Sequence, residues 1–216
     1  MTADSAAEFA RRLPALAPDG ERVPMGRIFA LAKEFLPMEP PQIESLLKSS
    51  DHAMRVGAVS IMDFQARRRG TPESRRADLF ELYLRRHDRI DTWDLVDRAA
   101  PYVVGGYLVD RPRDPLYVLA GSEHWWERRT AIVATYYFIR NGDLDDTFAI
   151  AELLAHDSEP LVQKAVGGWV REAGKRDPAR LLEFLDRHAP SMPRTALRYA
   201  VDNLDTGTRR HYLDLR

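Results

Sequence analysis

The chain has 216 residues, of which 44% are hydrophobic and 30% are charged. Its length suffices to bury a sizeable core in one domain or one repeat array, and no apolar run approaches the roughly 20 residues of a membrane-spanning helix. Its 32 basic and 33 acidic residues nearly cancel, and it has no cysteine. Membrane spans, disulfides, thiolate zinc sites, iron–sulfur clusters and thiol nucleophiles are therefore excluded.

The two ends of the chain are weakly patterned. Residues 1–20 are rich in Ala, Pro and Asp, and we expect a frayed terminus or a capping helix there. Residues 1–16 lack a basic stretch followed by an apolar one, so we expect no secretory signal and a cytoplasmic protein. Residues 205–216 suggest a polar tail. Because no linker interrupts the pattern between them, we predict a single domain over residues 1–216.

Apolar residues recur at helical spacing along the chain, as in Ile28, Leu31 and Phe35. Apolar side chains three, four and seven positions apart form one face of an α-helix. Proline or glycine separates these stretches, as at Pro40-Pro41 and Asn141-Gly142, and no sustained alternation with period two occurs. The sequence therefore predicts an all-α fold.

Three segments share one pattern, in which a basic residue is followed three positions later by a small one. The pairs are Arg55 with Ala58, Arg128 with Ala131, and Lys164 with Gly167. The basic positions lie 73 and 36 residues apart, so a degenerate copy is expected near residue 91. Five histidines recur in the same phase: His52, His87, His124, His156 and His188. We predict an α-solenoid of HEAT-like helix pairs, a superhelix whose concave face can hold an extended partner.

Several kinds of chemistry find no support in the sequence. The histidines occupy equivalent turn positions and form no His-x-x-x-His pair, so we expect no metal site. The glycine pairs at 105–106 and 167–168 lie inside helical patterns rather than in a phosphate-binding loop, and no Gly-x-Ser-x-Gly motif occurs. We expect no cofactor.

Residues 91–97 lie where the degenerate repeat is expected, but with a different pattern. Asp91 or Thr92 can cap a helix start, and Trp93 and Asp97 then project from one face, four positions apart. An indole beside a carboxylate suits a cationic ligand. The alternative is a core tryptophan beside a solvated aspartate.

Residues 125–131 contain two adjacent tryptophans and two adjacent arginines. Trp126 and Arg129 are three positions apart and share a face. Arg128 occupies the basic position of the repeat, where packing or pairing between helices is the alternative to a phosphate contact. Arginine suits bidentate phosphate contact, although only 4 of the 32 basic residues are lysine, which also fits a GC-rich genome.

Residues 162–172 place Gly167 and Gly168 inside a helix, at a cost of about 1 kcal/mol each relative to alanine. Such glycines indicate close approach, either to a neighbouring helix or to a ligand. Lys164, Arg171 and Lys175 are seven and four positions apart and lie on one side of this helix. Arg194, just after a proline at an expected helix start, is a weaker candidate for a contact with a phosphate backbone. The alternative is a solvated surface arginine.

Taken together, these segments resemble the AlkD-type DNA alkylation repair enzymes, a family of HEAT-like-repeat DNA glycosylases. The resemblance covers roughly residues 22–204. It rests on five ordered motifs: Met25-Gly26-Arg27-Ile28, Leu31-Ala32-Lys33-Glu34-Phe35, Trp93-Asp94-Leu95-Val96-Asp97, Trp126-x-x-Arg129-x-Ala131-Ile132, and Gln163-Lys164-Ala165-Val166-Gly167 with Arg171-Glu172.

The resemblance implies catalytic roles for Asp97, Trp93 and Arg129. It implies that DNA is contacted by a further set: Trp126, Arg128, Lys164, Trp169, Arg171 and Arg194. A family tryptophan normally follows the Gln-Lys-Ala-x-Gly motif directly, but here that position is Gly168 and the tryptophan is Trp169. One residue turns a helical side chain by about 100°. Either the helix is locally re-registered or one wall of the site is missing.

By this resemblance, the protein hydrolyses the N-glycosidic bond of cationic N3- or N7-alkylated purines in duplex DNA, as a monomer and without metal or lyase lysine. Two alternatives stay open. The departure at Gly168 suggests a non-catalytic relative that binds distorted or branched DNA, and the solenoid alone suggests a protein-interaction scaffold.

Overall fold

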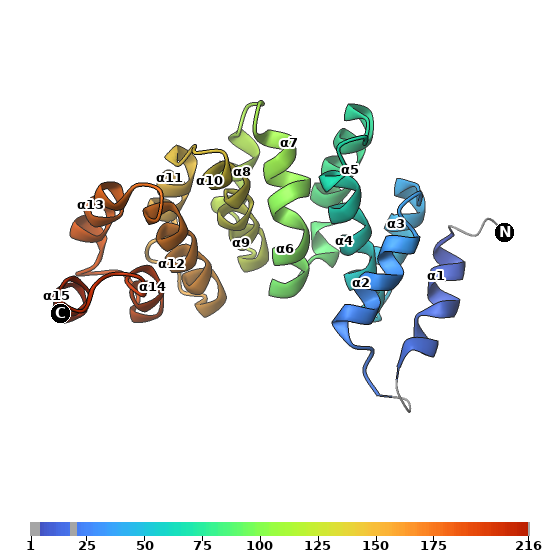
Figure 1. Cartoon of the computed structure of the whole chain (residues 1–216), viewed down its shortest axis with the longest axis horizontal. Coiled ribbons are helices and arrows are strands. Elements are labelled where there is room, and N and C mark those ends of the chain that lie inside the picture. The colour runs from blue at the N-terminus through green and yellow to red at the C-terminus, as the bar shows by residue number, and fades with distance from the viewer. Residues whose placement is uncertain (1–4, 18–20, 216) are drawn as a thin grey trace. The chain divides into compact units, whose positions relative to one another are not determined.

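A computed structural model describes residues 5–17 and 21–215, and its regular elements there are all helical. The chain packs as two compact units, Met1–Tyr107 and Leu108–Arg216. Each unit is built of short helices joined by tight turns (Figure 1). The all-α prediction of repeated helix pairs is confirmed. The assignment of all 216 residues to a single domain stays a prediction.

The first unit begins with α1 and continues through two three-residue 3₁₀ turns, η1 and η3, to a π-helical segment, η4. Its elements are α1 (Ala6–Arg12), η1 (Pro14–Leu16), α2 (Met25–Glu34), α3 (Pro40–Leu47), α4 (His52–Arg67), α5 (Glu73–Arg85), η3 (His87–Arg89), α6 (Trp93–Ala99) and η4 (Ala100–Gly105). The short α7 (Gly106–Leu108) follows directly. Helix α4 is central, because α2, α3 and α6 all pack against it.

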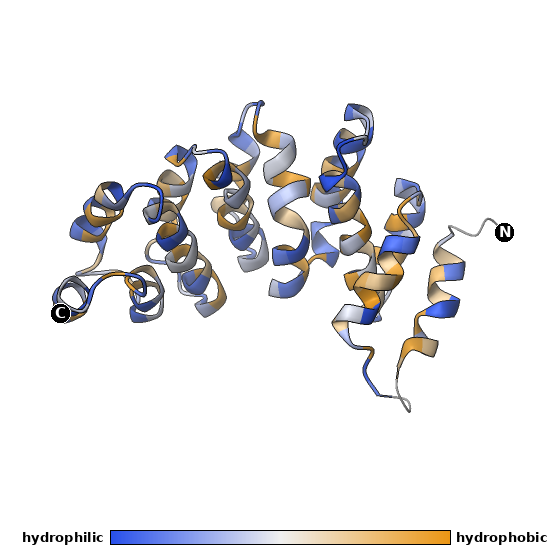
Figure 2. Ribbon diagram, viewed as in Figure 1, coloured by the Kyte–Doolittle hydropathy of each residue, from blue (hydrophilic) through white to orange (hydrophobic). Residues whose placement is uncertain are grey.

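The second unit repeats the same plan. Its helices are α8 (Asp114–Ala120), α9 (Trp125–Ala134), α10 (Tyr136–Arg140), α11 (Asp145–Leu153), α12 (Pro160–Gly174), α13 (Pro178–His188), α14 (Arg194–Ala200) and α15 (Thr206–Asp214). Here α12 is central, in contact with α9, α13 and α14. Figure 2 shows apolar and polar residues alternating around these helices, as expected for helices that each bury one face.

Local sequence explains where the helices start. Asp51 caps α4 by accepting a hydrogen bond from the Ala53 amide, and Asp177 caps α13 in the same way through the Arg180 amide. Proline occupies the first turn of α3, α8, α12 and α13, where its missing amide hydrogen costs nothing.

The repeat phase predicted from the sequence matches the helices. Arg55, Arg128 and Lys164 all lie in the first one and a half turns of a unit's longer helices, α4, α9 and α12. The small residues three positions later, Ala58 and Ala131 among them, are fully buried. Small side chains there let adjacent helices approach closely. The degenerate copy expected near residue 91 falls in the turn before α6, two residues ahead of Trp93, and so lies earlier relative to its helix than the other three.

Both ends of the described chain are helical. At the N-terminus, the capping-helix alternative holds for α1, whose Phe9 is fully buried and packs edge-on against Phe35 with ring centroids 5.2 Å apart. The rest of the 1–20 prediction, residues 1–4 and 18–20, lies outside the described residues. The segment expected to be a polar tail instead forms α15, because Asp205 caps its start and Tyr212 buries its ring against α13.

Glu44 ties α3 to α5. Its carboxylate lies 2.9 Å from Arg86 Nε and 3.1 Å from Arg85 Nη2, and 3.2 Å from Lys48 Nζ. The hydrogen bond from Arg86 lowers the pKa of Glu44 to about 2, although partial burial opposes it. A carboxyl whose pKa is depressed on folding contributes stability above its unfolded pKa, and this contribution is lost as the pH falls through the folded value.

Glu44→Gln is therefore expected to lower the free energy of unfolding by about 1 kcal/mol at pH 7, once the shift is discounted for solvent screening. The deficit shrinks as the pH falls from about 4.5 towards 2, where wild-type Glu44 itself becomes protonated. Urea titrations at pH 7 and pH 3 measure this difference, with Glu183→Gln on the exposed side of α13 as the control. An equal deficit at both pH values contradicts the assignment.

Candidate nucleic-acid interface

Helix α6 presents the first candidate side chains. Trp93 at its start is 52% exposed, and Asp97, one turn later on the same face, is partly exposed. The opposite face is anchored by Leu95 and Val96, which are fully buried. The alternative of a core tryptophan is therefore wrong for Trp93. A tryptophan ring that is half exposed in the folded protein is available to contact a ligand.

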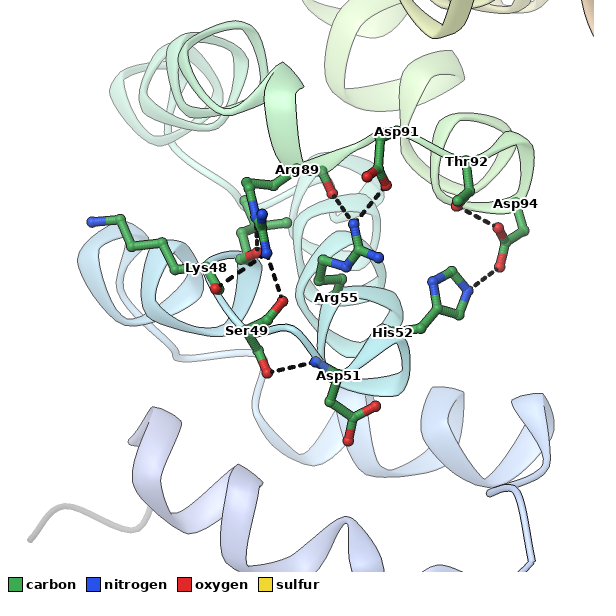
Figure 3. A network of polar contacts seen from close by, with 10 residues as sticks. Lys48, Ser49, Asp51, His52, Arg55, Arg89, Asp91, Thr92 and Asp94 are labelled. Atoms are coloured by element: carbon green, nitrogen blue, oxygen red, sulfur yellow. Dashed lines mark hydrogen bonds and ion pairs between the residues drawn. The ribbon is translucent and has the colours of Figure 1, made fainter.

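The start of α6 is held by a polar network (Figure 3). Asp94 accepts from the Thr92 hydroxyl at 2.7 Å, and its other oxygen lies 2.8 Å from His52 Nε2 of α4. Burial raises the pKa of Asp94, but the hydrogen bonds from Thr92 and His52 outweigh it, so the pKa is lowered. Thr92 is the N-cap residue, as expected, yet its side chain serves Asp94 rather than a helix amide.

A second set of contacts fixes the turn before α6. Arg55 of α4 donates to the Asp91 carboxylate at 2.5 Å and to the Arg89 carbonyl at 3.1 Å. The Arg89 guanidinium in turn donates to the carbonyls at the end of α3, including those of Lys48 and Ser49 (Figure 3). The backbone that carries Trp93 is thus fastened to both α3 and α4.

A buried carboxylate lies behind this surface. Asp63 of α4 is fully buried, with Arg67 Nε at 2.7 Å and Arg98 Nη2 at 3.1 Å. The Arg98 guanidinium also lies 4.5 Å from the ring centroids of Phe29 and Phe64. Burial raises the pKa of Asp63, although Arg98 and Arg67 both act to lower it. Sequence reasoning missed this cluster, for which the only signal is the four-residue spacing of Asp63 and Arg67.

In the second unit, Trp126 is packed at the start of α9. Its ring stacks on His124 with centroids 4.8 Å apart and meets Trp125 edge-on at 5.7 Å. Its indole Nε1 is buried and has no hydrogen-bond partner among the described residues. Trp126 is thus an aromatic cluster residue with limited exposure rather than a projecting side chain.

The two adjacent arginines of α9 are both engaged inside the protein. Arg128 donates to the Asp157 carboxylate at 2.6 and 3.0 Å and to two carbonyls of the preceding turn, and the Asp157 bond raises the pKa of Arg128. Arg129 is only 7% exposed and donates to the Leu161 carbonyl at the start of α12. The pairing alternative therefore describes Arg128, and Arg129 links α9 to α12.

The geometry of α12 shows whether the helix changes register at Gly168. It runs without interruption from Pro160 to Gly174, so it is not locally re-registered. Trp169 packs on Tyr136 with ring centroids 4.9 Å apart, and its side chain lies about 100° around the helix from position 168. Trp169 therefore does not substitute for a side chain at Gly168.

The remaining basic candidates differ in their engagement. Lys164 is exposed and has no ion-pair partner within the described part of the chain. Arg171 lies 3.2 Å from the Asp202 carboxylate at the surface. Arg194 donates to the Leu213 carbonyl at 2.6 Å and so joins α14 to α15. Of these three, Lys164 is the one most available to a phosphate.

The predicted residues thus fall into two groups. Trp93 and Asp97 share one face of α6 in the first unit. The others lie in the second unit, where α9 contacts α12: Trp126, Arg128, Arg129, Lys164, Trp169 and Arg171. Arg194 stands apart on α14. Over residues 5–17 and 21–215 there is no group of three or more side chains that could hold a metal ion.

None of the helices described is both long and apolar enough to cross a membrane. A chain of repeated helix pairs, with an exposed indole beside a carboxylate and a basic helix face, belongs to the class of helical-repeat proteins. A family model for the DNA alkylation repair enzyme matches residues 22–204. The chain belongs to this family, and membership supports a role in the repair of alkylated DNA and contact with DNA.

A solved structure titled "Predicted DNA alkylation repair enzyme from Enterococcus faecalis" is similar to this chain. The two share 17% sequence identity with a TM-score of 0.65, over 93% of this chain and 95% of the other. At this identity the likeness shows the fold. No curated protein matches the chain.

Arg128→Gln distinguishes a structural role from DNA contact. The variant leaves the buried Asp157 without its cation, so we expect the free energy of unfolding to fall by about 2 kcal/mol while affinity for duplex DNA stays unchanged. Thermal unfolding and fluorescence anisotropy with a labelled duplex measure the two effects. Arg198→Gln, at an exposed position of α14, is the control for loss of charge. Weaker DNA binding at unchanged stability is the result that disagrees with this assignment.

Proposed function

We propose that the protein is a monofunctional DNA glycosylase that hydrolyses the N-glycosidic bond of cationic N3- or N7-alkylated purines in duplex DNA. The observation that carries this proposal is the pair on α6, a tryptophan 52% exposed with a partly exposed carboxylate one turn later. The family membership of residues 22–204 supports the choice of DNA as the substrate.

The proposed chemistry follows from the substrate's charge. Alkylation at N3 or N7 gives the purine a positive charge and makes it a good leaving group. Breaking the bond to the sugar leaves positive charge on the deoxyribose, with oxocarbenium character. A carboxylate held close to that charge stabilises the transition state, so the Asp97 side chain takes this role and orients the attacking water.

Trp93 complements Asp97 in this proposal. The face of an indole attracts a cation, and its exposed area covers the sugar or the alkylated base without a deep pocket. The contacts of His52 and Thr92 with Asp94 hold the first turn of α6, which keeps the indole where the fold leaves it. Water attack at the sugar needs no metal, cofactor or amine nucleophile from the protein.

Arg129 takes a positioning role in this scheme. Its guanidinium is nearly buried and joins α9 to the Leu161 carbonyl, so it acts by setting the start of α12 rather than by touching the lesion. Lys164, four residues further along α12 from Pro160, is the proposed phosphate contact. We propose that the protein acts as a monomer in the cytoplasm, on the nucleoid.

A second candidate is a non-catalytic family member that binds distorted or branched DNA. The observation in its favour is Gly168, where α12 presents no side chain and the family pattern has a tryptophan. This candidate predicts DNA affinity that falls steeply with salt, without base release.

Asp97→Asn tests the proposed chemistry. We expect wild type to release N7-methylguanine and N3-methyladenine from methylated duplex, and the variant to do so about 10² to 10³ times more slowly, because the amide carries no charge to stabilise the sugar cation. Single-turnover release measures the chemical step. Binding of unmodified duplex is expected to be unaffected.

Asp110→Asn, at an exposed position outside α6, is the matched control and is expected to keep wild-type rates. Equal rates of base release by wild type and Asp97→Asn contradict the proposed role of Asp97. If wild type binds duplex but releases neither base, the glycosylase proposal fails and the second candidate takes its place.

A further inference from the structure

Helix α12 contains two adjacent glycines in opposite surroundings. A Cβ atom at Gly167 meets the Ala196 carbonyl oxygen at 2.2 Å and Tyr199 Cβ at 2.7 Å, so this glycine exists to let α14 pack closely. A Cβ atom at Gly168 meets nothing within 4 Å. The sequence left open whether these glycines allow close approach of a neighbouring helix or of a ligand. The structure shows close approach of a helix for Gly167 but not for Gly168.

Gly168 has no role in the packing of the protein itself. Glycine weakens the interior of a helix relative to alanine, and α12 continues for six residues beyond this position. The space beside Gly168 is therefore open to a partner from outside the chain.

The face on which Gly168 lies is basic. Lys164, Gly168, Arg171 and Lys175 are spaced by four, three and four residues, which places them in one stripe along α12. The opposite face is the buried one: Val162, Val166, Val170 and Ala173. Gly168 is thus a gap in a row of cations, with exposed Lys164 one turn before it and Arg171 one turn after it.

We infer that Gly168 is the point where the sugar–phosphate backbone of one DNA strand approaches the backbone of α12 most closely. Phosphates are drawn to the cations on either side, and the missing Cβ lets the strand lie against the helix between them. Arg171, partly exposed, lies 3.2 Å from the Asp202 carboxylate and 3.7 Å from Glu172. Ion pairs at the surface stabilise a protein only weakly, so a phosphate can replace Asp202 at this guanidinium. The inference rests on the proposed function in that its ligand is DNA.

Gly168→Ala tests the inference through two effects of opposite sign. Alanine favours the helix and has open space, so the melting temperature is expected to rise by about 2 to 4 °C. The added methyl group holds the strand away, so affinity for an unmodified duplex is expected to fall about threefold for alanine and about tenfold or more for Gly168→Leu. Thermal unfolding and fluorescence anisotropy with a labelled duplex supply the two readouts.

Two other glycines provide matched controls. Gly26 in α2 also has nothing within 4 Å of its Cβ position, so Gly26→Ala is expected to keep both fold and duplex affinity. Gly167→Ala is expected to lower the melting temperature, because its Cβ overlaps Ala196. Lys164→Gln is expected to reduce the slope of log affinity against log salt by about 1, as for loss of one phosphate contact.

Three outcomes overturn the inference. The first is wild-type duplex affinity in both Gly168→Ala and Gly168→Leu. The second is failure of the wild-type protein to bind duplex at low salt. The third is that the two variants keep duplex affinity but release bulky adducts more slowly, which assigns the space beside Gly168 to the adduct. Because affinity is measured on unmodified DNA, the contrast between Gly168 and Gly26 survives even if base release is absent. The two proposals therefore fail separately.

Discussion

The ion pair between one repeat and the next is the interaction on which the arrangement of candidate residues depends. Arg55 near the start of α4 reaches Asp91, just before α6, and Arg128 near the start of α9 reaches Asp157, just before α12. These side chains lie mostly out of solvent, so a guanidinium there without its carboxylate is costly. The first pair thereby fixes where α6 begins, and the second fixes where α12 begins.

The exposed indole of Trp93 follows from that constraint. Asp91 is held by Arg55 and Asp94 by His52, so the first turn of α6 is fastened on both sides of Trp93 while Leu95 and Val96 fill the core. No apolar neighbour covers most of the indole, and the half-exposed ring and the carboxylate of Asp97 stay on the same face. A rigid helix start that displays these two groups suits recognition of a cation.

Much of this could be predicted from the sequence. The period-3.6 apolar pattern fixed the helical class, the repeat phase located α4, α9 and α12, and the ordered motifs indicated the family over the residues that its model matches. The partner that each individual arginine contacts could not be predicted. Arg128, Arg129 and Arg194 carry the same charge as any phosphate-binding arginine, but each donates to a carboxylate or carbonyl within the second unit.

The sequence by itself thus determined the elements, because helix formation depends on local periodicity, caps and breakers. It also determined which residues share a helical face, such as Trp93 with Asp97. Only the tertiary structure decided which members of a face are covered. Gly167 and Gly168 are adjacent and chemically identical, yet one meets the backbone of α14 and the other faces open space. Burial is set by the neighbouring helix, and its position depends on the packing of the whole unit.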